Sequence, residues 1–551
     1  MNNFFQIYKD LIIKNKFVRL NKKIFNHNFE RLQSNSKILV EFNAFHYSHC
    51  YMSLIANYLA KKNSANIVAF DNYKLTSHKF ENNLSKKLKW IIGKFLRLNF
   101  FKIYKSFGVN EFIYPNINYL DLLKAKRLQK KILKNLIKKS DVIKIKIDNI
   151  LLGDLIYDGF LKFFTLETLD IKSNDFKKYL LEFIAIYFYW KKYLTKNDVK
   201  CIVGVHGHYA YGIIYRIAFQ KKIEVFTTMG GRIFKLDKTN PYNFDDYKYF
   251  KKNFSVFSKK QKKIARVLAK NIIKKRFEGE VGKNIKELIT TKSAFSKKYN
   301  KKSRFLNKNN KIKILIATHQ LGDACNFWGT NFFPDFYEWL KFLNKLTKNS
   351  KYEWYIKDHP YYSDLKYASS LDRTSQLTKR LVKENKNLIH LPNNISHHQI
   401  IKEKIDFVLT IYGTIAFEYA YFNIPVILAT KNCPNYISKI NITPSNINEY
   451  KKILKNLENT KIKIKNNDVL DYFFMRYVYN DYDIFFEKHS HFINKKNNWD
   501  DYDTVKFYEY WVKNIDLNKK KKMFEIFDKF YKSKKHTVDL SHNQKLYKKI
   551  F

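Results

Sequence analysis

The stretch IKDHP, residues 356–360, and the stretch DFVLTIYGTIAFE, residues 406–418, decide how we expect this chain to fold. In each stretch an apolar run of strand length ends in small or polar residues, and the second continues into a segment with helical spacing. Junctions of this kind, at the carboxyl ends of parallel strands, are where α/β proteins bind nucleotides. The two stretches therefore predict a nucleotide site at the edge of a parallel sheet.

The chain around these stretches alternates between short apolar runs and amphipathic segments. We expect strands over 312–317, 353–357, 388–391, 406–410 and 425–428, and helices over 332–346, 374–383, 396–404, 414–422 and 447–457. Strands and helices that alternate with short loops are typical of a parallel sheet covered by helices.

The first half of the chain shows the same alternation in a less regular form. We expect strands over 37–42, 66–70, 200–205 and 223–228, and helices over 51–61, 211–221 and 259–276. Between 119 and 194 the chain is Lys-rich with helical spacing, and its most apolar part, 180–190, has the length of a buried helix. This half therefore predicts a second α/β unit with a helical insertion.

These patterns divide the chain into three predicted parts. An α/β domain with helical insertions covers 1–300, a Rossmann-like domain covers 301–460, and a helical tail covers 461–551. The Lys- and Asn-rich segment 297–311 is the best linker candidate. Within the tail, 471–486 and 499–511 are expected to be helices that pack back on both domains, and the Lys-rich end from 519 a surface helix or tail. The predicted fold class is α/β, with two Rossmann-like domains and a helical C-terminal crossover.

The charge of the chain is strongly unbalanced, with 104 Lys and Arg against 49 Asp and Glu and a formal net charge of +55. A field of this sign attracts nucleic acid, anionic lipid headgroups or acidic glycans. A compositional explanation is also open, because Lys, Asn, Ile, Phe and Tyr are abundant while Gly and Pro are scarce. The basic residues are spread along the chain without a nucleic-acid-binding signature, so we expect no nucleic-acid partner.

Targeting and cysteine patterns indicate a cytoplasmic protein. Residues 1–16 carry charges among their apolar residues and lack the apolar core of a signal peptide. No apolar run reaches the roughly 18 residues needed to cross a bilayer. The four cysteines, Cys50, Cys201, Cys325 and Cys433, are far apart in the sequence, which suggests neither a disulfide framework nor a zinc site.

The IKDHP stretch places His359 at the expected carboxyl edge of the sheet, between Lys357-Asp358 and Pro360. An imidazole N–H in that position can donate to a nucleotide phosphate and stabilise the charge that develops as a bond to the phosphate breaks. Pro360 restricts the backbone before it and so holds the histidine in place. A solvated loop histidine before a proline would have the same sequence. The His-Pro dipeptide therefore indicates a nucleotide site only together with the second stretch.

The second stretch supplies Thr410, Gly413, Thr414 and Glu418. Gly413 lets backbone N–H groups approach a ligand, and Thr414 can cap the helix whose positive end then faces a bound anion. Glu418 lies one turn further on the same helical face, where its carboxylate can accept hydrogen bonds from ribose hydroxyls. Because the helix is mostly apolar, Glu418 is also expected to need a partner.

Other polar strand ends predict the opposite wall of a cleft. In the first half these are Glu41, His206, His208 and Arg232, of which a histidine or the carboxylate could accept the proton of a hydroxyl group. The structural alternatives are that His206 satisfies the hydrogen bonds of its turn and that Arg232 pairs with Asp237 at the surface.

His319 and Asp323 follow the first strand of the second half and are expected to face the same cleft. Several catalytic motifs are absent from the sequence: a Walker A loop, a Gly-rich dinucleotide fingerprint, a His-Glu-x-x-His motif and a nucleophile elbow. No Asp-x-Asp stands in a convincing strand-end loop, since the one at 501–503 lies in the tail. We therefore expect no metal and no bound cofactor.

The segment 312–428 resembles the bacterial capsule polysaccharide biosynthesis proteins, a family that includes CMP-Kdo-dependent Kdo transferases of the GT-B fold. More distantly it is similar to sialyltransferases with a His-Pro motif. The resemblance implies that His359 is catalytic and that the donor nucleotide-sugar is bound by Lys357, Asp358, Pro360, Thr410, Gly413, Thr414 and Glu418. From their position on the loop that faces the same cleft, His319 and Asp323 are expected to bind the donor as well. The chain departs from the family at Thr410 and Tyr412, where the family often has Ser.

The resemblance implies a nucleotide-sugar-dependent glycosyltransferase of surface polysaccharide synthesis, with a CMP-sugar such as CMP-Kdo as co-substrate and a glycan or glycolipid as acceptor. In this scheme the first domain binds the acceptor, and His206 or His208 faces His359 and takes the acceptor proton, with Glu41 as the alternative base. Two other functions stay open: a polyol-phosphate polymerase like those that make teichoic acids, and a non-catalytic export or scaffold protein. A nucleic-acid-binding protein, which the net charge alone would permit, is not expected.

A membrane-surface location is a further hypothesis. The stretch KWIIGKFLR, residues 89–97, combines Trp and Phe with Lys and Arg, as segments that lie on anionic bilayers do. A packed amphipathic helix has the same pattern.

Overall fold

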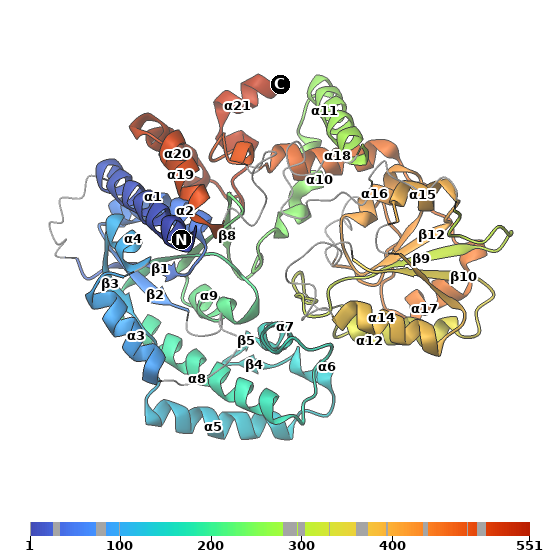
Figure 1. Ribbon diagram of the computed structural model, residues 1–551, viewed down its shortest axis with the longest axis horizontal. Helices are drawn as coiled ribbons and strands as arrows, with labels where there is room; N and C mark the ends of the chain where they lie inside the picture. The colour runs from blue at the N-terminus through green and yellow to red at the C-terminus, as the bar shows by residue number, and fades with distance from the viewer. Residues whose placement is uncertain are drawn as a thin grey trace.

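The computed structural model describes residues 2–25, 34–72, 84–98, 100–278, 295, 303–329, 331–359, 373–392, 395–432, 439–481, 483–492 and 503–551. Figure 1 shows two α/β units, with the C-terminal helices above the first of them and at its junction with the second. Within the described ranges, no helix is both long and apolar enough to cross a membrane.

The first sheet has six strands in the order β3-β2-β1-β6-β7-β8. Its strands are β1 (Lys37–Phe42), β2 (Asn66–Asp71), β3 (Val109–Ile113), β6 (Val199–Gly204), β7 (Glu224–Met229) and β8 (Arg232–Leu236). All neighbours are parallel except β7 and β8, which form a hairpin. Counted within this sheet, the strand order is 3-2-1-4-5-6, the order of dinucleotide-binding Rossmann sheets.

The Lys-rich region between β3 and β6 is not one helical stretch. It contains α5 (Tyr119–Lys134), α6 (Lys139–Val142), a hairpin of β4 (Lys146–Ile147) and β5 (Ile150–Leu151), α7 (Gly153–Phe164) and α8 (Asn174–Lys196). The expected helices break at the hairpin because Asp148 and Asn149 adopt positive φ angles in a tight turn. The apolar stretch 180–190 lies in α8, and most of its side chains are buried in the first-domain core, as expected.

The second sheet has five strands, all parallel, in the order β11-β10-β9-β12-β13. Its strands are β9 (Lys313–Ala317), β10 (Glu353–Lys357), β11 (Leu388–Leu391), β12 (Phe407–Thr410) and β13 (Val426–Leu428), and its helices are α12 (Phe336–Thr347), α14 (Arg373–Glu384), α15 (His397–Lys402), α16 (Ile415–Tyr421) and α17 (Ile447–Lys455). This is again the order 3-2-1-4-5. The predicted fold class of two Rossmann-like α/β units is confirmed.

The remaining helices lie outside the second sheet, and among them helices from the two ends of the chain pack on each other. They are α1 (Asn2–Phe25), α2 (His46–Asn63), α3 (Leu84–Phe95), α4 (Phe100–Ser106), α9 (Gly212–Gln220), α10 (Phe250–Ser255), α11 (Lys259–Phe277), α18 (Asn466–Phe474), α19 (Val505–Asn514), α20 (Leu517–Lys532) and α21 (Gln544–Ile550). α1 packs on α19, and α20 packs on α2.

The C-terminal segment packs back on both units, as expected. α18 contacts α11 and also α16 of the second unit, where the rings of Tyr472 and Phe473 touch Phe417. Phe527 of α20 contacts Phe226 in the first sheet. The predicted helix at 471–486 is offset, because α18 ends at Phe474 and a π-helix continues to Tyr479. Of the predicted helix at 499–511, residues 499–502 lie outside the described residues and α19 begins at Val505.

Candidate active site

In each sheet the chain builds outward in opposite directions from one pair of neighbouring strands, and we call the place between them the switch point of the sheet. Ligands of α/β proteins bind at the carboxyl ends of the strands beside the switch point. In the first sheet it lies between β1 and β6, and in the second between β9 and β12. The loops that leave these four strands carry most of the residues predicted for the site. The site is therefore built from two switch points, one in each sheet.

At the second switch point, His319 and Thr410 join the loops after β9 and β12. The distance from His319 Nε2 to Thr410 Oγ1 is 2.9 Å, and the imidazole stacks on Phe336. A side chain at Gly413 would place its Cβ 3.3 Å from His319 Cε1, so the glycine leaves room for the ring. Burial and the neighbouring His359 lower the pKa of His319 to about 3. His319 is therefore neutral at pH 7.

His359 lies two residues beyond β10, half-buried, and within electrostatic reach of His319, Asp323 and Lys357. Burial lowers its pKa to about 4, so its imidazole is neutral and offers one N–H donor and one acceptor. Lys357, the last residue of β10, is buried, and its pKa is lowered to about 8. Pro360 lies outside the described residues.

Asp358 does not point into the cleft. Its carboxylate accepts a hydrogen bond of 2.7 Å from Thr378 on α14, and its other oxygen lies 3.1 Å from His390 Nε2 on β11. Burial alone would raise its pKa, but these partners hold the pKa below its ordinary value. Both carboxylate oxygens of Asp358 therefore already have partners within the second unit, at the end of β10.

Thr414 and Glu418 are also occupied by protein. Thr414 stands at the N-cap position of α16 but makes no capping hydrogen bond with its side chain, contrary to expectation. Arg276 of α11 forms a buried ion pair with Glu418 at 2.5 Å and donates to Thr414 Oγ1 at 3.4 Å. The expected partner of Glu418 therefore exists, and it ties the second unit to α11.

Glu41 is the central residue of the first switch point and is fully buried. Its Oε2 accepts hydrogen bonds from Val205 N at 3.1 Å and from the Tyr215 hydroxyl at 2.7 Å. Gly204 makes this possible, because a Cβ there would lie 1.7 Å from the Tyr215 hydroxyl. The other oxygen, Oε1, makes no hydrogen bond of ordinary length to any described residue, although the Asn72 side chain lies near enough to act against the rise in the pKa. Burial raises the pKa of Glu41 from 4.5 to about 7.

His206 and His208 follow β6, with ring centroids 5.0 Å apart. The Nδ1 atom of each ring is buried and has no hydrogen-bond partner within the described part of the chain. Burial and Lys162 lower the pKa of His206 to about 4, and burial lowers that of His208 well below 6.5. Both imidazoles therefore have pKa values below the ordinary value of 6.5. They are weak bases at pH 7, and Glu41 is better matched to accept a proton.

Asp323, Tyr209 and Lys162 connect the two switch points. The Tyr209 hydroxyl donates to Asp323 Oδ1 at 2.9 Å, and Lys162 of α7 lies over the Tyr209 ring, 5.9 Å from its centroid. Lys162 lowers the pKa of both His206 and Asp323, and Asp323 in turn acts on His359. Because Lys162 and Asp323 are both exposed to solvent, they form the water-accessible centre of the site between the two histidine pairs.

Tyr209 and Lys162 were not predicted from the sequence, and neither was Arg276. Tyr209 carries one visible sign of its role, since a tyrosine with a φ angle of +53° is strained and such strain gathers at functional sites. Arg232, by contrast, does not pair with Asp237 at the surface. It is buried and bonds Asp246 at 2.8 Å.

Helix α7 also fixes the relative position of the two units. Asp158 accepts hydrogen bonds from the backbone and side-chain nitrogens of Asn326, at 2.9 and 2.8 Å. Asp335, at the start of α12, accepts from Tyr157 and from Thr168, both at 2.6 Å. These buried bonds hold the loop after β9 against α7, so that Asp323 stays next to Tyr209.

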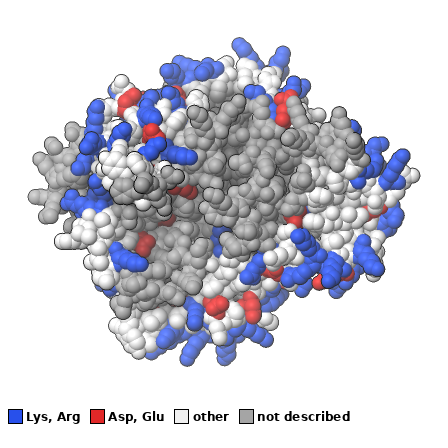
Figure 2. All heavy atoms as spheres, viewed as in Figure 1, with Lys and Arg blue, Asp and Glu red and all other residues white. Residues whose placement is uncertain are grey.

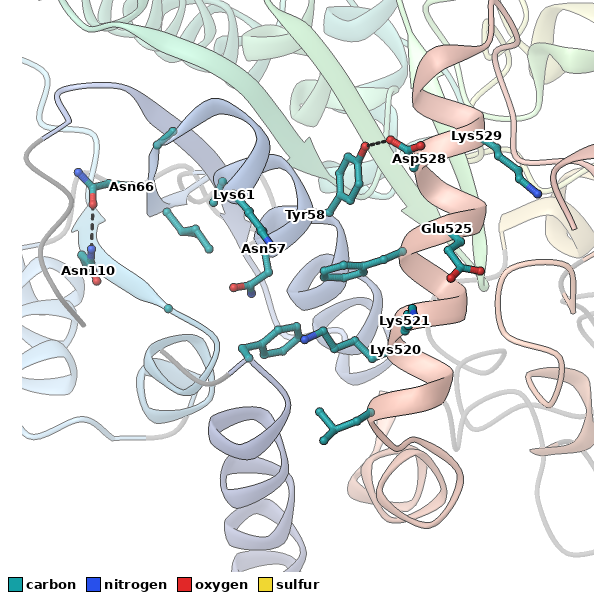
Figure 3. Close-up of a pocket in the computed structure, with 17 residues that line it drawn as sticks. Asn57, Tyr58, Lys61, Asn66, Asn110, Lys520, Lys521, Glu525, Asp528 and Lys529 are labelled. Carbon is teal, nitrogen blue, oxygen red and sulfur yellow. Dashed lines mark hydrogen bonds between the residues drawn. The ribbon is translucent and has the colours of Figure 1, made fainter. Parts of the chain in front are cut away.

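A cavity of about 920 Å³ lies away from this site. Figure 3 shows it between α2, α20 and the amino-terminal ends of β2 and β3, where Asn66 and Asn110 are hydrogen-bonded and Tyr58 donates to Asp528. The switch points lie at the opposite, carboxyl ends of the strands. The cavity is therefore separate from the histidine cluster.

No protein-family model matches the chain, and no curated protein sequence matches it. Solved structures do show similarity. The KpsC β-Kdo 2,4-transferase of Thermosulfurimonas dismutans is 10% identical over 50% of this chain and 79% of that one, with a TM-score of 0.31. UDP-GlcNAc 2-epimerase of Neisseria meningitidis is 11% identical over 80% and 97%, with a TM-score of 0.21. The wall teichoic acid polymerase TagF is 11% identical over 93% and 97%, with a TM-score of 0.19. At TM-scores this low, residue roles do not transfer from these proteins to this chain.

Proposed function

We propose that this protein is a glycosyltransferase that moves a sugar from a nucleotide-linked donor to a hydroxyl group of a glycan or glycolipid, in the synthesis of a surface polysaccharide. The observation that carries the proposal is the pair of switch points joined by Asp323, Tyr209 and Lys162. One wall offers neutral imidazoles from the strand ends where nucleotides bind. The other offers a carboxyl group whose pKa is about 7.

On the donor side, His359 and His319 supply hydrogen bonds to the leaving phosphate, and the exposed ammonium of Lys162 adds positive charge. The bond between the anomeric carbon and the phosphate oxygen breaks, and its electron pair stays on the phosphate. Fixed N–H donors and cations stabilise that developing charge without reorganising during the reaction.

On the acceptor side, the unsatisfied Nδ1 atoms of His206 and His208 bind the acceptor hydroxyl groups. The acceptor oxygen forms the new bond to the anomeric carbon, and its proton passes to the Glu41 carboxylate. With a pKa near the working pH, Glu41 is ionised often enough to accept the proton and basic enough to hold it.

The donor we favour is CMP-Kdo or a related CMP-sugar, on the strength of the sequence resemblance alone. Melting temperatures measured with CMP, CDP, UDP and GDP test the nucleotide, because a ligand that binds only the folded protein raises the melting temperature. Products are then identified by mass spectrometry with the matching donors, with and without EDTA. We expect sugar transfer that EDTA leaves unchanged.

Three results would contradict the proposal. Transfer of a polyol phosphate would identify a polymerase of the teichoic-acid type. Nucleotide binding without turnover of any donor would favour a scaffold protein, and a melting temperature unaffected by every nucleotide would remove the nucleotide site itself.

A further inference from the structure

Helix α3 and the residues after it expose a row of large apolar side chains. Their exposed fractions run from 44% at Ile92 to 83% at Phe95. The full set is Leu88, Ile91, Ile92, Phe95, Leu96 and Leu98, and we call it the apolar rim. Single exposed apolar residues are ordinary on protein surfaces, but a contiguous group of this kind marks a surface that binds something.

The helix is firmly attached to the protein by its other face. Trp90 packs in edge or tilted geometry against Phe42, Phe101 and Tyr114, with ring centroids 4.8 to 5.5 Å away. Gly93 fits against Phe101 so closely that a Cβ would lie 2.8 Å from its ring. The packed amphipathic helix, the alternative explanation of residues 89–97, therefore accounts for Trp90 and Gly93, but it does not account for the apolar side chains that α3 exposes.

The charges that α3 and the residues after it carry are all positive. Residues 84–98 contain five Lys and Arg and no Asp or Glu. Lys89, Lys94 and Arg97 are exposed, and within the described residues none of them forms an ion pair. Figure 2 shows Lys and Arg distributed around the outline of the molecule on the face drawn. What distinguishes α3 is thus the combination of cations with exposed apolar side chains.

Helix α1 carries a second exposed apolar group, Phe5, Ile7, Tyr8, Leu11 and Ile12. α4 contacts α1, and its Phe101 contacts α3, so both groups flank α4. Both also lie at the carboxyl end of the first sheet, because Trp90 touches the ends of β1 and β3 and Lys14 lies within electrostatic reach of His46 after β1. The exposed apolar groups are therefore on the same edge of the sheet as Glu41 and His206.

We infer that the apolar rim docks on an anionic lipid bilayer. Phe95, Leu96 and their neighbours enter the interface between headgroups and acyl chains, while Lys89, Lys94 and Arg97 meet anionic headgroups. A second copy of this chain fits less well, because a symmetric contact would bring two acid-free basic helices together. The inference does not depend on which group the site transfers, and it sets the acceptor side of the cleft next to the membrane surface.

The test is co-sedimentation of the purified full-length protein with vesicles of phosphatidylcholine alone or with about 30% phosphatidylglycerol. We expect binding to the anionic vesicles and weaker binding at high salt. The double variant Phe95→Asp with Leu96→Asp should bind at least about tenfold more weakly, because it removes two apolar groups that would enter the bilayer. The triple variant Lys89→Gln, Lys94→Gln and Arg97→Gln should bind about 100-fold more weakly.

Matched controls distinguish binding through the apolar rim from non-specific hydrophobic or electrostatic binding of the protein to vesicles. Ile137→Asp removes a side chain that is 88% exposed but stands elsewhere on the first domain. Replacing Lys259, Lys260 and Lys263 of α11 by Gln removes the same charge from another exposed basic helix. Both should bind vesicles nearly as the wild type does, and all variants should keep the wild-type melting temperature and rate of donor hydrolysis.

Several outcomes would overturn the inference. One is a wild type that stays in the supernatant with anionic vesicles. Another is a pair of α3 variants that bind no more weakly than the α11 control. A third combines two observations. Light scattering shows that the wild type is a dimer and the Phe95→Asp, Leu96→Asp variant a monomer, and neither protein binds vesicles. The apolar rim would then join two copies of the chain.

Discussion

The two switch points are built from the same topology but differ in how their polar groups are satisfied. At the second one, His319 bonds Thr410, Asp358 bonds Thr378 and His390, and Glu418 bonds Arg276. At the first one, Glu41 Oε1 and the Nδ1 atoms of both histidines are buried and make no hydrogen bond of ordinary length to any described residue. The second site is assembled in advance, whereas the first is short of hydrogen bonds that a bound molecule can supply.

This difference suits the two switch points to different chemical roles. A preassembled set of neutral donors suits a charged group that must be held in one geometry, such as a phosphate. A buried carboxyl group with a raised pKa suits a step in which a proton is taken and later released. The predictions below separate these two roles, and they run from the largest expected effect to the smallest.

Replacing His359 by Ala should have the largest effect. We expect turnover to fall about 10³-fold, because one N–H donor to the leaving phosphate is lost. The melting temperature should change little, since the side chain is only half-buried. His390→Ala is the comparison variant, because it removes a partner of Asp358 at the end of β10 but leaves the His359 imidazole in place, so it should lower turnover far less. Turnover of the His359 variant near that of the wild type would remove His359 from the mechanism.

The pH dependence of stability should reveal the buried proton of Glu41. A carboxyl group whose pKa is higher in the folded protein binds its proton more tightly there, so its contribution to stability is complete below pH 4.5 and is lost as the pH rises toward about 7. The difference between these pKa values corresponds to about 3 kcal/mol. Glu41→Gln has no such proton, so it should gain stability relative to the wild type between pH 5 and pH 8. Parallel stability curves for the two proteins would show that the pKa of Glu41 is ordinary.

The same variant tests the chemistry of the first site. Glu41→Gln should lower turnover about 100-fold and remove the limb of the pH–rate profile in which activity rises toward pH 7. Tyr215→Phe removes one hydrogen bond to the same oxygen but no acid or base, so it should keep that limb. If single His206→Gln and His208→Gln variants lose the limb while Glu41→Gln retains it, a histidine is the base after all.

The sequence predicted the two sheets well because their strands are apolar and buried on both faces. Strand β3 was missed because it is an edge strand with exposed Asn110 and Glu111, which break the apolar run. Strand β8 was missed although Gly230 and Gly231, both with positive φ, form the two-residue turn of a hairpin with β7. That pair of glycines was the signal that could have found it.

The strand-end residues of the site were predictable for the same reason, since a parallel sheet sets its loops at one edge. Their partners were not predictable. Arg276 reaches Glu418 across 142 residues, and Tyr209 reaches Asp323 across 114. Nothing in the local sequence indicates such pairs, and the low pKa values of the histidines follow from burial that only the packed structure creates.

The smallest effect expected is that of Glu418→Gln, and it should fall on stability. Glu418 was expected to bind the donor ribose, but its carboxylate is paired with Arg276 in a buried site, and loss of one charge leaves the other uncompensated. Because glutamine still accepts a hydrogen bond from the guanidinium, we expect a loss of about 2 kcal/mol. Glu167→Gln, which breaks the more exposed pair with Arg380, should lose less than about 1 kcal/mol. Chemical unfolding measures both, and nucleotide titration measures donor affinity in the same variants. A Glu418 variant that unfolds like the wild type but binds nucleotide more weakly would show that the second switch point is not fully preassembled and that Glu418 exchanges Arg276 for the donor.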